Sequence, residues 1–144
     1  MLGKIYADAY GMDIIMVRAF NHIGPGQSEQ FVVSDFCKQV AALERNQAPS
    51  VIKVGNLKAK RDFTDVRDVV RAYALLMNRG KSGETYNVGS GKAVSIEEIL
   101  KMIISFSQKE IQIEIEEKRF RPIDVMIIEA NIGKLQACTN WRPE

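Results

Sequence analysis

The apolar run Ile14–Val17, followed closely by a Gly-Pro-Gly turn, is the feature that most constrains the fold. These consecutive apolar residues do not alternate with polar ones, as they would in a strand with one face in water. Such a run is typical of a strand covered on both faces, as in a parallel sheet flanked by helices. We therefore expect a buried strand over residues 13–20 that ends at the turn His22–Gln27.

The rest of the chain alternates helical and extended patterns. Helical spacing and capping signals predict helices over residues 2–10, 31–45, 65–80 and 95–106, and a last short helix after Asn131. Strand patterns lie at residues 51–54, 84–88 and 111–117, and a polar loop is expected over residues 55–63. In the helix at 65–80, the expected apolar face consists of Val66, Val69, Val70, Tyr73 and Met77. This alternation indicates an α/β fold.

Length and composition limit the class of protein. The 144 residues are enough for one packed domain, with 46% hydrophobic and 26% charged residues. No apolar run approaches the ~20 residues of a membrane-spanning helix, and no signal peptide is evident, so we expect a cytoplasmic protein without a membrane partner. A net charge of +2 gives no reason to expect nucleic acid. The two cysteines, Cys37 and Cys138, lack further ligands nearby, so no metal site is expected.

The stretch RAFNHIGPGQ, residues 18–27, contains the only histidine. His22 has no orienting carboxylate nearby in sequence, so a structural role or a backbone contact is favoured over general base catalysis. Asn21 would stand at the carboxyl end of a buried parallel strand, where α/β proteins bind ligands, and its amide can donate to a phosphate or a hydroxyl oxygen. The glycines Gly24 and Gly26 would allow a ligand to approach the backbone, although an ordinary turn needs the same residues.

Two arginines in loops are further candidates, and each is close to a carboxylate. Arg61 precedes Asp62, and Arg121 lies near Asp124. A guanidinium matches the geometry of a phosphate with two parallel hydrogen bonds, whereas the same pairs could equally be structural salt bridges.

The Gly-rich stretch GSGKAVS, residues 89–95, invites comparison with a phosphate-binding loop. Its spacing is wrong, because Ser95 stands three residues beyond Lys92 rather than next to it. The pair Ser95 and Glu98 instead has the spacing of a helix capping box, which explains the serine without a ligand.

Three longer segments together resemble one known family. They are RAFNHIGPGQ, VGNLKAKRDFTDVRDVVRAY and GETYNVGSGKAVSIEEIL, and a shorter RPID follows them. They are similar to the C-terminal half of extended short-chain dehydrogenase/reductases that act on nucleotide sugars. Within that family they resemble the GDP-sugar branch, GDP-4-dehydro-6-deoxy-mannose reductase and GDP-mannose 4,6-dehydratase. The resemblance implies the substrate-binding C-terminal portion of an NAD(P)-binding Rossmann-fold enzyme, with the N-terminal Rossmann half missing.

The resemblance implies six substrate-binding residues, which are Asn21, Val32, Asn56, Arg61, Arg121 and Asp124. The two arginines would clamp the diphosphate of a GDP-sugar, and the asparagine at position 21 would also contact it. The helix start at position 32 and the asparagine at position 56 would lie near the guanine. The aspartate would accept hydrogen bonds from the ribose hydroxyls.

The resemblance also implies NAD or NADP as the cofactor of the full-length enzyme, with Phe20 and His22 near its nicotinamide. In the family a G-x-x-G-x-x-G loop in the N-terminal half binds the cofactor, and a Tyr-x-x-x-Lys pair is catalytic. Neither Tyr6 nor Tyr10 is followed by Lys four residues on, and the glycine loop is missing. We expect the catalytic pair upstream of Met1, so this chain alone would bind no cofactor stably and would be inactive.

The segments FNHIGPGQ and FVVSDF resemble the reductase, since dehydratases tend to carry a basic residue where Asp35 stands. The expected reaction of the parent enzyme is reduction of the C4 ketone of GDP-4-dehydro-6-deoxy-mannose. The alternatives are a GDP-mannose 4,6-dehydratase, another NAD-dependent nucleotide-sugar epimerase or dehydratase, and a binding module without catalysis.

The resemblance also bears on assembly. The strands at 13–20 and 84–88 would belong to the sheet of the missing half, so their apolar faces and edges would be exposed in this chain. We therefore expect self-association or reduced stability of the chain alone. Separately, we expect the parent enzyme to be a homo-oligomer.

Overall fold

The structure is a computed structural model that describes residues 2–120 and 122–144. The chain folds into two compact units and passes back and forth between them. The first unit consists of Met1–Gly24, Asp62–Ala93 and Glu129–Glu144, and the second consists of Pro25–Arg61 and Val94–Ile128. All strand pairs with a described register are parallel. Helices therefore have to supply the connections, as the predicted α/β class requires.

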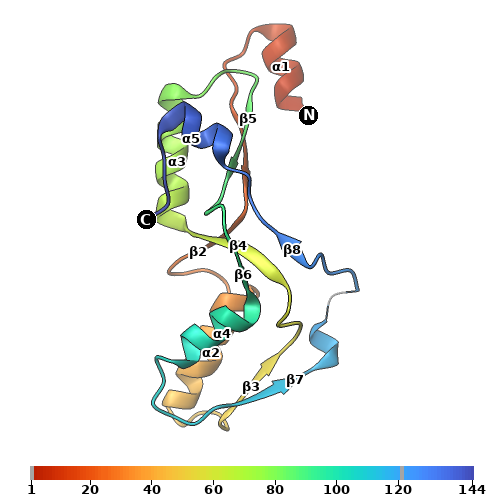
Figure 1. The fold of residues 1–144 in the computed structure, drawn as a ribbon, viewed down its shortest axis with the longest axis vertical. Coiled ribbons are helices and arrows are strands. Elements are labelled where there is room, and N and C mark those ends of the chain that lie inside the picture. The colour runs from red at the N-terminus through yellow and green to blue at the C-terminus, as the bar shows by residue number, and fades with distance from the viewer. Residues whose placement is uncertain (1, 121) are drawn as a thin grey trace. The chain divides into compact units, whose positions relative to one another are not determined.

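The first unit is built on a parallel pair of strands. Its elements are α1 (Leu2–Tyr10), β1 (Met16–Ala19), β2 (Asn21–Ile23), α3 (Val66–Arg79), β5 (Thr85–Val88) and α5 (Gly133–Thr139). β1 pairs with β5 along its whole length, and α5 packs against both α3 and β5 (Figure 1). The buried core consists of Val69, Ala72, Leu76, Tyr86, Val88, Ala130, Ile132, Leu135 and Trp141.

Helix α3 starts and stops as its sequence predicts, but it buries a different face. The Asp65 side chain caps it by accepting a hydrogen bond from the Arg67 backbone N–H at 2.8 Å. Gly80 ends it. The residues buried on α3 are Asp68, Val69, Ala72 and Leu76, and the exposed apolar ones are Val70, Tyr73 and Met77. The helix thus carries two neighbouring apolar stripes, and helical periodicity alone does not tell which one meets the core.

The strand predicted over residues 13–20 forms as β1, with two corrections. Ile15 and Val17 pack against the core, yet the whole run Ile14–Val17 stays partly exposed, because β5 is the only partner of β1 among the described strands. The expected end at His22 is also wrong. The chain continues as β2, where Asn21 pairs with Phe63 in parallel, and the turn follows only after it.

The second unit packs two helices beside a second parallel strand pair. Its elements are α2 (Val32–Glu44), β3 (Val51–Val54), α4 (Ile96–Ile104), β7 (Gln112–Ile115), the short 3-10 helix η1 (Glu117–Arg119) and β8 (Ile127–Ile128). β3 pairs with β7, and α2 packs against α4 and β3 (Figure 1). The buried apolar residues of this unit are Phe36, Val40, Leu43, Ile52, Val54, Ala59, Ile96 and Leu100.

Two strands run from one unit into the other. They are β4 (Lys60–Asp65) and β6 (Ala93–Ser95), which pair with each other. The loop predicted over residues 55–63 is wrong from Lys60 onward, because β4 also pairs with β2 and β8. Its charged first residues give no alternating signal, so only its partners define it as a strand.

Candidate functional site

Arg61 is the second residue of β4, and its guanidinium is held from several sides. Nη1 donates to the carbonyl oxygens of Lys60 and Val125, each at 2.7 Å. Nη2 donates to Oδ1 of Asp124. The side chain is 11% exposed, and that of Asp124 is 18% exposed, so this ion pair is shielded from much of the solvent. A charge-assisted pair in such surroundings fixes the direction of the guanidinium.

Asp124 receives a second donor from another loop. The Asn56 side-chain amide donates to its Oδ2 at 2.8 Å, while Oδ1 of Asn56 accepts from the Lys58 backbone N–H at 3.0 Å. The structure thus brings together three of the residues predicted from the sequence, Asn56, Arg61 and Asp124. We call these three residues the Arg61 cluster. A salt bridge between Arg61 and Asp62 was one of the two alternatives left open by the sequence, and it is not formed, because Arg61 pairs with Asp124.

The remaining predicted substrate residues lie elsewhere. Val32 is the half-buried first residue of α2, in the same unit as the Arg61 cluster. Asn21 is the exposed first residue of β2, in the other unit. Arg121 lies outside the described residues, so its role stays a prediction.

The two residues predicted to border a cofactor follow β1. Phe20 is half-buried, donates its backbone N–H to the Val88 carbonyl oxygen at 2.8 Å, and packs against the core of the first unit. His22 is exposed, and its Nδ1 lies 3.1 Å from the Phe20 carbonyl oxygen.

A second polar network, which the sequence did not predict, lies in the same unit as the Arg61 cluster. Arg119 donates to Asp35 at 2.8 Å and to Glu116 at 3.0 Å. The Gln39 amide also donates to Asp35, at 2.9 Å, and the Lys53 ammonium donates to Glu116 at 2.9 Å. The partners come from segments far apart in the chain, so the local pattern gave no signal.

The charges of this network shift the pKa values of three of its members, Glu116, Lys53 and Arg119. The hydrogen bond from the Lys53 ammonium, with further help from Arg119 and Lys118, lowers the pKa of Glu116 from 4.5 to about 2. The same contact raises the pKa of Lys53. Glu116 therefore stays ionised far below neutral pH, and it balances the basic residues around η1.

Asp62, next to Arg61 in β4, is fully buried, and its hydrogen-bond partners were not predicted from the sequence. Its carboxylate accepts hydrogen bonds from the backbone N–H groups of Ser90 and Gly91, at 2.6 and 2.9 Å. The N–H groups of this Gly-rich turn thus bind an anion, as in a phosphate loop, but the anion belongs to the chain itself. The capping box predicted for the same stretch is confirmed, because Ser95 and Glu98 exchange hydrogen bonds.

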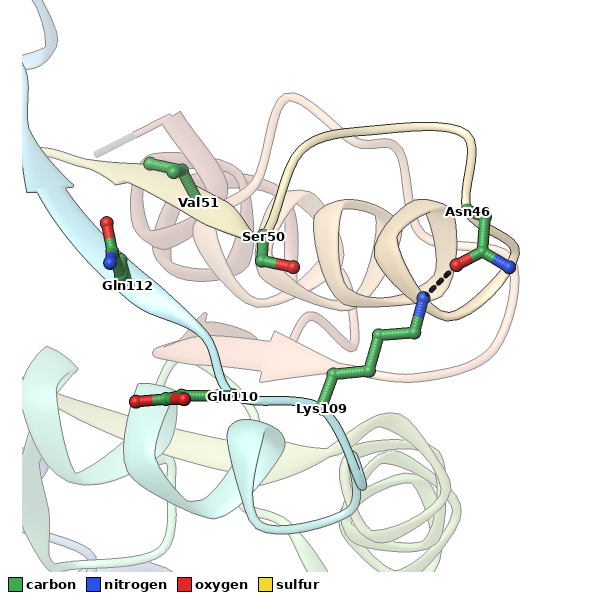
Figure 2. A pocket seen from close by; sticks show the side chains of 6 residues that line it. All are labelled: Asn46, Ser50, Val51, Lys109, Glu110 and Gln112. Atoms are coloured by element: carbon green, nitrogen blue, oxygen red, sulfur yellow. Dashed lines mark hydrogen bonds between the residues drawn. The ribbon is translucent and has the colours of Figure 1, made fainter.

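One hollow of about 650 Å³ lies in the second unit, and none of the predicted site residues is among those that line it (Figure 2). Its lining residues are Asn46, Ser50, Val51, Lys109, Glu110 and Gln112. Figure 2 shows the Lys109 ammonium reaching Asn46, at 2.5 Å from its Oδ1. Lys109 also donates to the Leu43 carbonyl oxygen near the end of α2. This lysine therefore stabilises a helix C-terminus.

The described part of the chain contains no group of three or more His, Cys, Asp or Glu side chains arranged to hold a metal ion. None of its helices has the length and apolar character needed to cross a membrane.

Comparison with known proteins identifies relatives among sugar-nucleotide enzymes. The chain is 34% identical to the GDP-6-deoxy-D-mannose reductase of Pseudomonas aeruginosa over 134 residues, which are 93% of this chain and 44% of that protein. It is 26% identical to the GDP-mannose 4,6 dehydratase of Drosophila melanogaster, covering 96% of this chain and 40% of that protein. The chain thus spans less than half the length of these relatives and resembles their C-terminal part.

Solved structures give the same result. The structure of RMD from Pseudomonas aeruginosa complexed with NADPH matches 99% of this chain and 47% of that one, with a TM-score of 0.93 and 31% identity. A putative epimerase from Burkholderia cenocepacia matches 94% of this chain and 43% of that one, with a TM-score of 0.80 and 35% identity. The predicted fold class, the C-terminal portion of an extended short-chain dehydrogenase/reductase, is confirmed. The sequence profile of the family described as GDP-mannose 4,6 dehydratase matches residues 1–144, and the chain therefore belongs to that family.

Proposed function

We propose that the chain is the nucleotide-sugar-binding part of an NAD(P)-dependent GDP-sugar reductase, which reduces the C4 ketone of GDP-4-dehydro-6-deoxy-mannose. The observation that carries the proposal is the Arg61 cluster, in which a guanidinium, a carboxylate and an amide converge from three loops and strands. The 34% identity to a GDP-6-deoxy-D-mannose reductase supports this substrate class.

The described hydrogen bonds of Arg61 leave two of its N–H donors for a ligand. Of its five N–H donors, two on Nη1 serve carbonyl oxygens and one on Nη2 serves Asp124. Among the described contacts, Nε–H and the second N–H of Nη2 have no acceptor. In our proposal these two donors are available to phosphate oxygens, which a guanidinium binds with charge-assisted hydrogen bonds. In our proposal Arg61 therefore binds the diphosphate, with Arg121 and Asn21 as further contacts.

Asp124 and Asn56 supply the groups that a nucleoside needs. An ionised carboxylate only accepts hydrogen bonds, so Asp124 suits the two hydroxyls of a ribose. Asn56 offers both a donor and an acceptor, and with Val32 at the start of α2 it would border the guanine. To bind the nucleoside, Asp124 and Asn56 would replace the hydrogen bond between them with hydrogen bonds to the ligand.

The cofactor in this proposal is NADH or NADPH, which supplies the hydride when bound. The chain itself carries neither a G-x-x-G-x-x-G loop nor a Tyr-x-x-x-Lys pair. Phe20 and His22 would border the nicotinamide through their backbone, which fits their described contacts with their own strand and with β5. The glycine loop and the proton donor would come from a longer protein, and we propose that this chain alone binds no cofactor stably.

Calorimetric titration of the full-length gene product with GDP, GMP and UDP tests the substrate class. We expect GDP to bind more tightly than UDP because of the guanine contacts, and more tightly than GMP because of the second phosphate. Arg61→Ala should weaken GDP binding roughly tenfold or more, since it removes charge-assisted hydrogen bonds. Lys60→Ala, which removes the exposed cation next to it in β4, is the matched control and should leave binding unchanged. Equal affinity for GDP and UDP, or an Arg61→Ala variant with unchanged affinity, would refute the proposal.

The second candidate reaction is that of a GDP-mannose 4,6-dehydratase. It is favoured by the description of the family profile and by the Drosophila relative. A product analysis distinguishes the two. The reductase consumes GDP-4-dehydro-6-deoxy-mannose together with NAD(P)H, whereas the dehydratase converts GDP-mannose to that ketone with loss of water. Conversion of GDP-mannose alone would overturn the reductase assignment.

We propose further that β1 and β5 extend a larger sheet in the full-length protein, and that this protein forms a homo-oligomer. The partial exposure of Ile14–Val17 and the five exposed apolar residues at the start of the chain support both ideas. These five are Leu2, Ile5, Tyr6, Tyr10 and Met12. Sedimentation of the 144-residue chain over a concentration series should reveal self-association. A stable monomer that unfolds cooperatively at every concentration would contradict the expected self-association.

A further inference from the structure

Asp62 is a charged residue that the proposed binding site does not use. It is fully buried, and its carboxylate accepts four hydrogen bonds within the first unit. The donors are the Ser90 backbone N–H and hydroxyl, both at 2.6 Å, the Gly91 N–H at 2.9 Å and the Ala130 N–H at 3.1 Å. Among the residues that the structure describes, no Lys or Arg pairs with it. The negative charge is therefore held by backbone dipoles and one hydroxyl.

The turn around this carboxylate is shaped to fit it closely. A Cβ atom at Gly89 would lie 2.9 Å from Oδ2 of Asp62 and 2.5 Å from the Ala130 Cβ. Gly91 adopts a φ of +78°, which aims its N–H at the same carboxylate and which side chains other than glycine rarely allow. The turn and the segment at Ala130 thus close around one short acidic side chain.

The position of Asp62 connects this closed turn to the Arg61 cluster. Arg61 and Asp62 are consecutive in β4, so their side chains point to opposite faces of the strand. On the same strand, Lys60 pairs with Ile127 and Arg61 with Ile128 of β8. Beyond these pairs, the Ala130 N–H donates to the Asp62 carboxylate, so a side chain takes the place of the backbone in the next contact between the two segments.

The segment that the ladder fixes also carries the partners of Arg61. Asp124 and Val125, which accept hydrogen bonds from its guanidinium, lie just before β8. The Met126 carbonyl oxygen accepts from the Lys60 backbone N–H at 2.7 Å. A slip of the segment at Ala130 relative to β4 would therefore move the carboxylate and carbonyl that orient Arg61.

We infer that Asp62 is a positioning residue for Arg61, since it fixes the register of β4 against residues 124–130 and so aims the guanidinium at a phosphate. This inference rests on the proposed function. Asp62 does not touch the ligand, and it acts through the backbone and through Arg61.

A double-mutant cycle tests the inference in the full-length gene product, with GDP as the probe. Asp62→Asn keeps the size of the side chain but places an NH₂ group against backbone N–H donors. We expect it to weaken GDP binding roughly tenfold in the wild-type background and to have no further effect in Arg61→Ala, because its influence passes through that guanidinium. A merely structural role would instead lower affinity by the same factor in both backgrounds.

Asp68→Asn is the matched control, because Asp68 is another buried carboxylate of the first unit and binds Arg71 and the Glu144 backbone N–H. We expect it to reduce stability without changing GDP affinity. Ser90→Ala removes the hydroxyl that donates to Asp62 at 2.6 Å and accepts from the Lys92 N–H at 3.2 Å, and it provides a milder test if Asp62→Asn does not fold. It should weaken GDP binding in the wild-type background and not in Arg61→Ala.

The outcomes separate this inference from the proposed function. Failure of the wild-type protein to bind GDP, or an Arg61→Ala variant with full affinity, would overturn the proposed function. Binding that depends on Arg61 but is lowered equally by Asp62→Asn in both backgrounds would overturn only the role of Asp62.

Discussion

The close approach at Gly89 yields a sharp prediction about stability. An alanine Cβ there would lie 2.5 Å from the Ala130 Cβ and 2.9 Å from Oδ2 of Asp62, and both distances are below what real Cβ atoms tolerate. The φ of Gly89 is not in the left-handed region, so the cost of Gly89→Ala comes from this contact alone. Either the Ala130 segment or the Asp62 carboxylate must move away.

The expected magnitude follows from two contributions. Forcing an extra methyl group into a packed site costs about 1–3 kcal/mol. Weakening a hydrogen bond to a buried charged group adds about 1.5 kcal/mol or more. We therefore expect Gly89→Ala to lower the free energy of unfolding by about 2.5–4.5 kcal/mol, the sum of these two contributions.

Urea unfolding followed by tryptophan fluorescence measures this change. Trp141 is the only tryptophan and is 1% exposed in the core of the same unit, so its emission reports unfolding there. Gly133→Ala is the matched control, since the nearest atom to its new Cβ would be 3.3 Å away and alanine suits a helix. It should change stability by less than about 1 kcal/mol. A Gly89→Ala variant whose free energy of unfolding lies within about 0.5 kcal/mol of wild type would refute the description of this turn. Changes as small as that are typical of substitutions at surface sites.

Three further predictions concern single side chains. The Thr64 hydroxyl is buried and has no hydrogen-bond partner among the described residues, so Thr64→Val should leave the urea midpoint unchanged or raise it; a loss above about 1 kcal/mol would mean that the hydroxyl is bonded. The pKa of Glu116 is lowered from 4.5 to about 2. Its contribution to stability is therefore fully present above pH 4.5 and is lost as the pH falls toward 2. Glu116→Gln should therefore flatten the pH dependence of unfolding in that window, and an unchanged profile would contradict the ion pairs with Lys53 and Arg119. Ser95→Ala should cost about 1 kcal/mol in thermal or urea unfolding by removing the cap of α4, and a cost near zero would argue against the capping box.

The helices were predictable because their signals are local. The Asp65 cap and Gly80 stop of α3, and the capping box of α4, are confirmed at the expected residues. The extent of the strands was less predictable, because β2 and the start of β4 are strands only through their partners. No local pattern in KRDFTD distinguishes a strand from a polar loop.

The candidate site was predicted residue by residue, but its connections were not. The residues and the family resemblance selected Asn56, Arg61 and Asp124, and the structure adds that Asn56 and Arg61 both donate to Asp124. The alternative that Arg61 forms a salt bridge with Asp62 is wrong, because neighbours in a strand point to opposite faces. The real partner of Asp62 is the Gly-rich turn, which becomes recognisable only once the fold brings β4 and residues 89–91 together.

The central claim is that GDP binds at the Arg61 cluster, and a titration followed by ¹H–¹⁵N NMR spectra tests it most directly. With GDP added to the isotope-labelled protein, we predict shift changes at the side-chain amide of Asn56, the Nε–H of Arg61 and the backbone around Asp124. The residues that line the hollow, such as Asn46 and Gln112, provide the comparison within the same unit. Changes concentrated at those residues, with the Arg61 cluster unperturbed, would contradict the account.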